Sequence, residues 1–277
     1  MHKILYIAFI LTVATAGMAA AQTDRSRLSK NELRHLQKYQ ILRKEENSGF
    51  QYAHSFTAGA RLTTNGWSGT LEYARKTSSL TNTLFQFDLG EIKDPKEEKQ
   101  SIPISYYDPS GFGYYFTSKP YVYGKENVFY QARLGIGQQR LIGGKGNKNG
   151  VEVSAVYLGG VSLGLLKPYY LELYDSSGNS STFQKYSSAN ASLFLNQNDI
   201  AGGGGFSRGL NEMTLVPGLY VKAGVRFDWA EFNEFVSALE VGVSAEGYSQ
   251  KIHIMIENPG QQFFYGAYLS LIFGKRW

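Results

Sequence analysis

The sequence predicts an all-β fold in which antiparallel strands close into an up-and-down barrel that crosses a membrane. Three observations support this prediction. After residue 53, apolar and polar residues alternate with a period of two in a series of runs, the last of which reaches the end of the chain. The alternating runs are longer than a typical soluble strand, which has about five or six residues. They are long enough for a tilted membrane strand, which needs about 9–11 residues. Finally, aromatic residues gather near the ends of the runs, where a membrane interface would lie.

The composition of the 277-residue chain excludes several other classes of protein. Charged residues make up 18%, which is too few for a disordered chain, and there is no Cys to form disulfides or thiolate metal sites. The net charge of +5 is a mild excess spread along the chain, so we expect no nucleic-acid partner.

Residues 1–21 are predicted to be a cleaved secretory signal peptide. A short basic start ending at Lys3 precedes an apolar run over residues 4–16, and three alanines stand before Gln22. The apolar run is about 13 residues long, whereas a single membrane anchor needs about 20. The mature protein is therefore expected to leave the cytoplasm.

Residues 22–50 are predicted to form a helical leader in the periplasm. Apolar residues recur there at helical spacing: Leu28, Leu33, Leu36, Tyr39 and Leu42. The leader is either a docking or membrane-surface helix or, as we favour, a solvated segment before the main domain.

The strands of the barrel domain, residues 51–277, follow from the alternation. The Asn65-Gly66 pair between two alternating runs predicts a tight hairpin. Eight strands are expected at residues 53–63, 67–76, 82–91, 127–140, 150–174, 215–229, 235–249 and 262–275. Segments 64–66, 92–126, 175–214 and 250–261 are then outer loops, and short turns lie at the opposite end. A break at Lys167-Pro168 together with a strand hidden in 92–126 would give ten strands instead.

The polar side of the strands is predicted to face the interior of the barrel. A soluble sandwich would turn this side to water, whereas a membrane barrel faces its apolar side to lipid. Because eight strands enclose only enough room for side chains, the inward charges must pair in a closed interior. The predicted network comprises Arg61, Glu72, Asp88, Arg133, Glu152, Lys222, Arg226, Asp228, Glu240 and Glu246.

The last strand carries the pattern of an assembly signal for an outer-membrane barrel. Leu269, Leu271 and Phe273 alternate on one side, and the chain ends in Trp277; Lys275 interrupts the apolar pattern. The predicted location is therefore the bacterial outer membrane. The expected partners are outer-membrane lipid and, during biogenesis, the assembly machinery.

Candidates for catalysis are few. His253, in a predicted outer loop, could form an acid–base pair with Glu246 or Glu257, but an exposed loop histidine is more often without a catalytic role. The glycine-rich stretch 143–150 lacks the full phosphate-loop pattern. We therefore expect no catalytic residue, no metal, no cofactor and no enzymatic activity.

Several stretches together resemble a family of uncharacterised outer-membrane β-barrel proteins from Bacteroidota. These stretches are TNGW at 64–67, GEIKDPKEEK at 90–99, YVYGKENVFYQARLGIGQQR at 121–140, GVSLGLLKPYYLEL at 160–173, LVPGLYVKAGVRF at 215–227, and the ending FGKRW. The resemblance implies the same location and fold and assigns no activity.

Three functions remain open from the sequence. The favoured one is a non-enzymatic structural or accessory component of an envelope complex. The second is a small, porin-like diffusion channel or importer, and the third is a lipid-modifying enzyme or protease.

Overall fold

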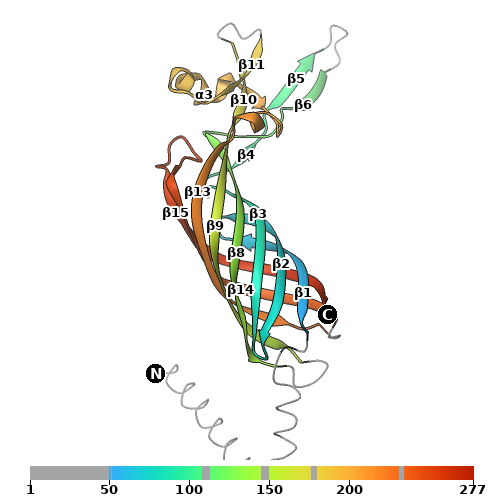
Figure 1. Ribbon diagram of the computed structural model, residues 1–277. Helices are drawn as coiled ribbons and strands as arrows, with labels where there is room; N and C mark the ends of the chain where they lie inside the picture. Colours follow the sequence, from blue (N-terminus) through green and yellow to red (C-terminus); the bar gives the residue numbers. More distant parts are fainter. Residues whose placement is uncertain (1–49, 51, 108–112, 145–149, 176–179, 231–233) are drawn as a thin grey trace, which may run out of the picture. The chain divides into compact units, whose positions relative to one another are not determined.

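The computed structural model describes residues 50, 52–107, 113–144, 150–175, 180–230 and 234–277. Eight long strands of this part close into an antiparallel barrel in the order β1-β15-β14-β13-β9-β8-β3-β2 (Figure 1). They are β1 (His54–Thr63), β2 (Gly66–Ser78), β3 (Thr81–Ile92), β8 (Asn127–Gly143), β9 (Glu152–Pro168), β13 (Thr214–Asp228), β14 (Phe235–Ile252) and β15 (Gln261–Arg276). The predicted fold class is confirmed, and the count of eight is the correct alternative.

Pairing of the first strand with the last closes the barrel. β1 pairs with β15 from Ser55–Arg276 to Thr63–Tyr268. Each remaining pair of neighbours is also antiparallel, so every strand has a partner on both sides and no long edge is left open. In a bilayer, where no water can satisfy an open edge, this closure pairs the backbone amides.

The two ends of the barrel differ in the length of their connections. Short turns join β2 to β3, β8 to β9 and β13 to β14 at the end that also holds the start of β1 and the end of β15. We call this the short-turn end. The opposite, long-loop end carries the connections 93–126, 169–213 and 253–260, and the tight turn between β1 and β2. A Cβ at Gly66 in that turn would collide with the carbonyl oxygen of Glu91, which explains the glycine of the Asn65-Gly66 pair.

The long loops contain short strands outside the barrel. A three-stranded sheet has the order β11-β10-β12, from β10 (Tyr170–Tyr174), β11 (Ser181–Lys185) and β12 (Ile200–Gly203). The strands β4 (Lys99–Gln100) and β7 (Tyr121–Val122) pair, as do β5 (Pro103–Tyr107) and β6 (Gly113–Thr117). The single turn of α3 (Ala191–Phe194) and the 3-10 turns η1 (Ser188–Asn190), η2 (Gln197–Asp199) and η3 (Leu210–Glu212) complete these connections.

The prediction of one long strand over 150–174 is wrong. β9 leaves the barrel at Pro168, and β10 begins two residues later in the separate sheet. This break lies at Lys167-Pro168, where the ten-strand alternative placed it. It does not raise the count to ten, because the strands within 92–126 pair only with one another.

The strands alternate as predicted between a buried inward side and an exposed outward side. On β15, Tyr268, Ser270 and Ile272 are at most 3% exposed, whereas Leu269, Leu271 and Phe273 are 43–54% exposed. The outward side is apolar around the barrel, as a lipid-facing surface requires. Among the described residues, no helix has the length and apolar character needed to span a membrane. The predicted signal peptide and leader lie outside the described residues, except for Phe50.

Candidate functional site

The interior of the barrel is the main concentration of charged side chains in the described chain. All the charged residues predicted to face inward are buried there, at 9% exposure or less. Strands on every side contribute to the set, so residues distant in sequence meet across the lumen. Apart from Glu152, which is buried on β9, these charges form two linked groups and a third pair near the short-turn end.

Glu240 on β14 is the centre of the first group and is fully buried. Its Oε1 accepts hydrogen bonds from Lys222 Nζ and Tyr268 Oη, both at 2.8 Å. Its Oε2 accepts from Arg226 Nε at 2.9 Å and Nη2 at 2.6 Å. The guanidinium of Arg226 also donates twice to Glu72 across the lumen, at 2.7 Å each. Two carboxylates thus neutralise two cations with bidentate geometry.

Asp88 on β3 is the centre of the second group. Its carboxylate lies 3.4 Å from Arg61 Nη1 and 3.7 Å from Arg133 Nε. Arg133 donates to Glu246 at 2.6 Å, and Arg61 donates to Ser270 on β15 at 2.9 Å. Arg61 also lies over the ring of Tyr268, 4.8 Å from its centroid, which joins this group to the first.

The third pair, Asp228 and Arg276, lies near the short-turn end. Arg276 Nη2 donates to Asp228, and its Nε donates to the carbonyl oxygen of Phe235. Its guanidinium also lies 4.6 Å from the centroid of the Tyr52 ring. Phe50, which is 1% exposed, packs against Tyr52, so residues from just before β1 help to fill this end.

An aromatic cluster fills the interior towards the long-loop end. The ring of Phe129, fully buried, lies 5.1 Å from Tyr248 and 5.6 Å from Phe264 between centroids. Val216 and Ile252 pack in the same cluster. Tyr248 connects it to the charges, because its hydroxyl donates to Glu246 Oε2 at 2.8 Å. The charged layer is therefore bounded by buried aromatic residues towards both ends.

Sequence reasoning missed some members of this interior. Arg276 belongs to it, and its position on the polar side of the last strand, two residues after Gly274, could have identified it. Gln86 and Gln131 are also buried there, and the tyrosines Tyr220, Tyr248 and Tyr268 line it. A tyrosine in an alternating run does not indicate whether its side chain faces inward or outward, because tyrosines occur both in the aromatic girdle at the membrane interface and in the lumen of a barrel.

The structure does not bring the suggested acid–base pair together. The carboxylate of Glu246 is buried in the lumen and bonded to Arg133 and Tyr248, whereas His253 is an exposed loop residue. The group whose pKa responds to His253 is Glu126: burial raises the pKa of this carboxyl, and the His253 charge opposes the rise. Within the described chain, no group of acidic and histidine residues has the geometry of a metal site.

The residues of the predicted assembly signal lie on the outward side of β15. Leu269, Leu271, Phe273 and Trp277 are 43–60% exposed. The backbone of Trp277 continues the pairing with β1, since its amide donates to the carbonyl oxygen of His54 at 2.9 Å. Lys275 is also outward, but it lies beside Phe56 and Phe235 at the short-turn end, where its amine can reach water. Their role in assembly remains a prediction.

Comparisons with known proteins found similarity only among solved structures. No family model and no curated protein matches the chain. The structure of Ail, the attachment invasion locus protein of Yersinia pestis, matches with 11% identity and a TM-score of 0.34, over 81% of this chain and 95% of that one. Ail in complex with the heparin analogue sucrose octasulfate matches with 12% identity and a TM-score of 0.33, over the same shares. Neisserial surface protein A matches with 10% identity and a TM-score of 0.35, over 80% of this chain and 94% of that one. At these identities and scores, the similarity carries no argument about function.

Proposed function

We propose that this protein is a non-enzymatic outer-membrane β-barrel of a Gram-negative envelope, which anchors a folded loop structure at the cell surface as a component of an envelope complex. The observation that carries the proposal is the interior of the barrel. Its described charges are five basic (Arg61, Arg133, Lys222, Arg226, Arg276) and six acidic (Glu72, Asp88, Glu152, Asp228, Glu240, Glu246), and buried ion pairs between strands join the basic residues to Glu72, Asp88, Asp228, Glu240 and Glu246.

A lumen filled in this way favours an anchor over a channel. Water and solutes would have to pass both the charged layer and the aromatic clusters towards each end. Opening a path would break several buried ion pairs, each costing several kcal/mol, about 3–5 when one partner is lost. The diffusion-channel alternative therefore has less support.

The orientation of the barrel supports display at the cell surface. In outer-membrane barrels of this kind the short turns face the periplasm and the long loops face outward. The long-loop end would then be extracellular. The start of β1, the end of β15 and the predicted leader would lie on the periplasmic side.

The extracellular connections have a hydrophobic core of their own. Tyr121, Leu171, Leu173, Phe194 and Ile200 are buried together, at 2% exposure or less. The Tyr123 hydroxyl donates to the carbonyl oxygen of Leu195 at 2.6 Å across this region. A segment of loop that orders itself in this way presents a defined surface, which suits protein recognition better than a gate.

The experiment has two steps. Cell fractionation should place the protein in outer-membrane material that resists urea washing and dissolves in detergent. Cross-linking in cells, followed by purification in mild detergent, should then yield a defined neighbour. The variant Leu171→Ala removes a buried side chain of the loop core and leaves the barrel residues unchanged; it should keep the folded-barrel mobility on an unheated gel and lose the neighbour. A soluble protein, or a wild-type barrel without neighbours, would contradict the proposal.

A further inference from the structure

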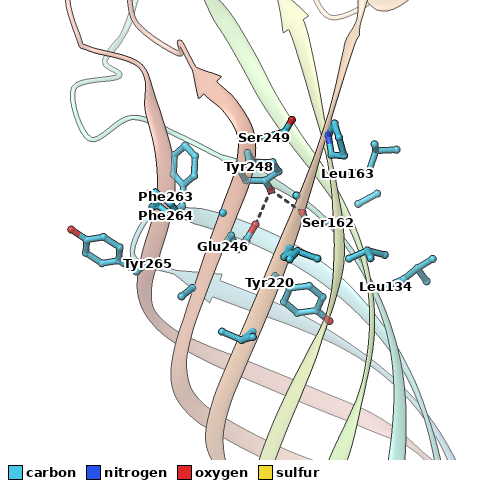
Figure 2. A pocket seen from close by; sticks show the side chains of 18 of the residues that line it. Leu134, Ser162, Leu163, Tyr220, Glu246, Tyr248, Ser249, Phe263, Phe264 and Tyr265 are labelled. Atoms are coloured by element: carbon cyan, nitrogen blue, oxygen red, sulfur yellow. Dashed lines mark hydrogen bonds between the residues drawn. The ribbon is translucent and has the colours of Figure 1, made fainter.

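A trough runs along the outward side of β14 near the long-loop end. Its floor is made of small side chains, Ala245, Gly247 and Ser249, which succeed one another on that side. β15 provides one wall, where Tyr265 pairs with Ala245 and Phe263 pairs with Gly247. Figure 2 shows Phe263 and Tyr265 on one side of β14 and Leu163 on the other. The hollow has a volume of about 1310 Å³ and an almost wholly apolar lining.

The opposite wall and the depth of the trough follow from the pairing of β13 and β14. Leu219 pairs with Gly247, and Val221 pairs with Ala245, so one strand of small residues lies between two of large ones. The pairing of β13 with β14 ends at Gly218–Tyr248, after which β14 also changes register against β15. Pro217, the residue before this last pair, has no amide hydrogen to donate to a neighbouring strand. The strands therefore separate beside the trough.

A second, polar hollow adjoins the trough at the rim. It has a volume of about 550 Å³ and shares Phe263, Phe264 and Tyr265 with the trough. Its other walls are the loops that carry Asn65, Asp94 and Asn258, with Gln261 and Gln262 at the start of β15. The apolar and polar hollows thus share the same aromatic residues.

The chemistry of the rim hollow favours hydroxyl groups over phosphates. The Asn258 amide donates to Asp94 at 2.8 Å and accepts from Lys96, which lies outside the lining, at 2.8 Å. The lysine in the lining, Lys93, lies 3.9 Å from Glu91, whose carboxylate faces its charge. Gln261 is exposed in the lining, where its amide can donate and accept at once. Amides and a carboxylate beside aromatic rings suit a neutral sugar. The hydroxyl groups of a sugar both donate and accept hydrogen bonds, and its apolar CH faces can pack on the rings.

We propose that the trough and the rim hollow together bind one glycolipid of the outer leaflet, with an acyl chain along Ala245 and Gly247 and a neutral sugar head group at Gln261. The inference rests on the proposed membrane placement, because the trough meets hydrocarbon only if the outward side does. Fractionation tests that placement, whereas the selectivity described next tests the site. The two can therefore fail separately.

The test is native mass spectrometry of the full mature protein in mild detergent, titrated with two lipids that have the same acyl chains. One is monoglucosyl-diacylglycerol, and the other is phosphatidylcholine. The wild type should bind the glucolipid about tenfold more tightly, the effect of one or two net hydrogen bonds. Methyl glucoside, which has no chain, should not compete at equal concentration.

Matched variants separate the two parts of the site. Ala245→Phe fills the floor of the trough and should weaken binding of both lipids about tenfold, whereas Ala60→Phe, on the outward side of β1, should change neither. Gln261→Ala should reduce only the preference for the glucolipid, about threefold, whereas Gln197→Ala in an outer loop should not. Should Ala245→Phe fail to fold, Tyr265→Ala removes a wall and should weaken both lipids as well.

Three results would overturn the inference. The first is equal binding of the two lipids by the wild type. The second is equal affinities for Ala245→Phe and Ala60→Phe, or an unchanged affinity for Tyr265→Ala. The third is competition by methyl glucoside as strong as by the glucolipid itself, since the sugar alone would then be the ligand.

Discussion

Replacing Glu240 by Gln tests the energetic role of the charged interior. The change keeps the shape of the side chain but removes the negative charge that faces Lys222 at 2.8 Å and Arg226 at 2.6 Å. Glu72 then remains to balance Arg226, and Lys222 loses its direct partner. Because Glu240 and Lys222 are nearly fully buried, the loss of one partner should lower the free energy of unfolding by about 3–5 kcal/mol.

The assay is equilibrium unfolding by urea in lipid vesicles, followed by tryptophan fluorescence and by gel mobility without heating. The second substitution, Lys222→Met, removes the charge that the first leaves unpaired. The double variant Glu240→Gln with Lys222→Met should therefore be more stable than the sum of the two single losses predicts. Glu212→Gln, at an exposed ion pair with Lys185 in an outer loop, is the control and should leave the unfolding midpoint unchanged. Unchanged stability of Glu240→Gln, or strict additivity in the double variant, would refute the reasoning.

Three further predictions concern other parts of the molecule. Phe129→Ala should cost about 3–5 kcal/mol in the same unfolding assay, because its ring is fully buried against Phe264; a loss below 1 kcal/mol would show that the cluster is not packed as described. Trp277→Ala should lower the amount of barrel assembled in cells while the assembled fraction keeps its gel mobility, and equal assembly would argue against a terminal signal. The hydrogen bond from Lys185 lowers the pKa of Glu212, so this contact should persist at pH 5 and weaken as the pH falls below the ordinary range of Glu; trypsin cleavage after Lys185 should be faster in Glu212→Gln at neutral pH, and equal rates would contradict the contact.

The barrel itself could be predicted because its signals are local. Alternation with a period of two sets which side of each strand is buried, and the Asn65-Gly66 turn fixes one hairpin. Apart from the end of β9 at Pro168, the strand boundaries agree within a few residues, since alternation stops where a strand ends. The sequence left the ten-strand alternative open because Pro168 indicates the end of a strand but does not indicate whether the next strand belongs to the barrel.

The sequence did not predict the loop structure, and the reason is physical. β10, β11 and β12 are four or five residues long, and the sheet needs β12, which follows β11 only after several turns of the loop, to pair with β10. Short strands of this kind are stabilised by a shared core, here around Leu171 and Phe194, and not by a repeated pattern. The sequence likewise could not predict which inward charges pair with one another. Alternation places Glu72 and Arg226 on the inward side, but only closure of the barrel brings them within 2.7 Å.

The proposed trough shows the same limit. Ala245 and Gly247 read as ordinary members of an alternating strand, and nothing local marks them as a floor. They become one because register places Tyr265 and Phe263 beside them on one side, and Val221 and Leu219 on the other.

The central claim, that the lumen is closed by its own side chains, is tested most directly by electrical recording across a planar lipid bilayer. The purified barrel, inserted in folded form as judged by gel mobility, should give no steady conductance above the bare bilayer. Steady, uniform single-channel steps from the wild type would contradict the account.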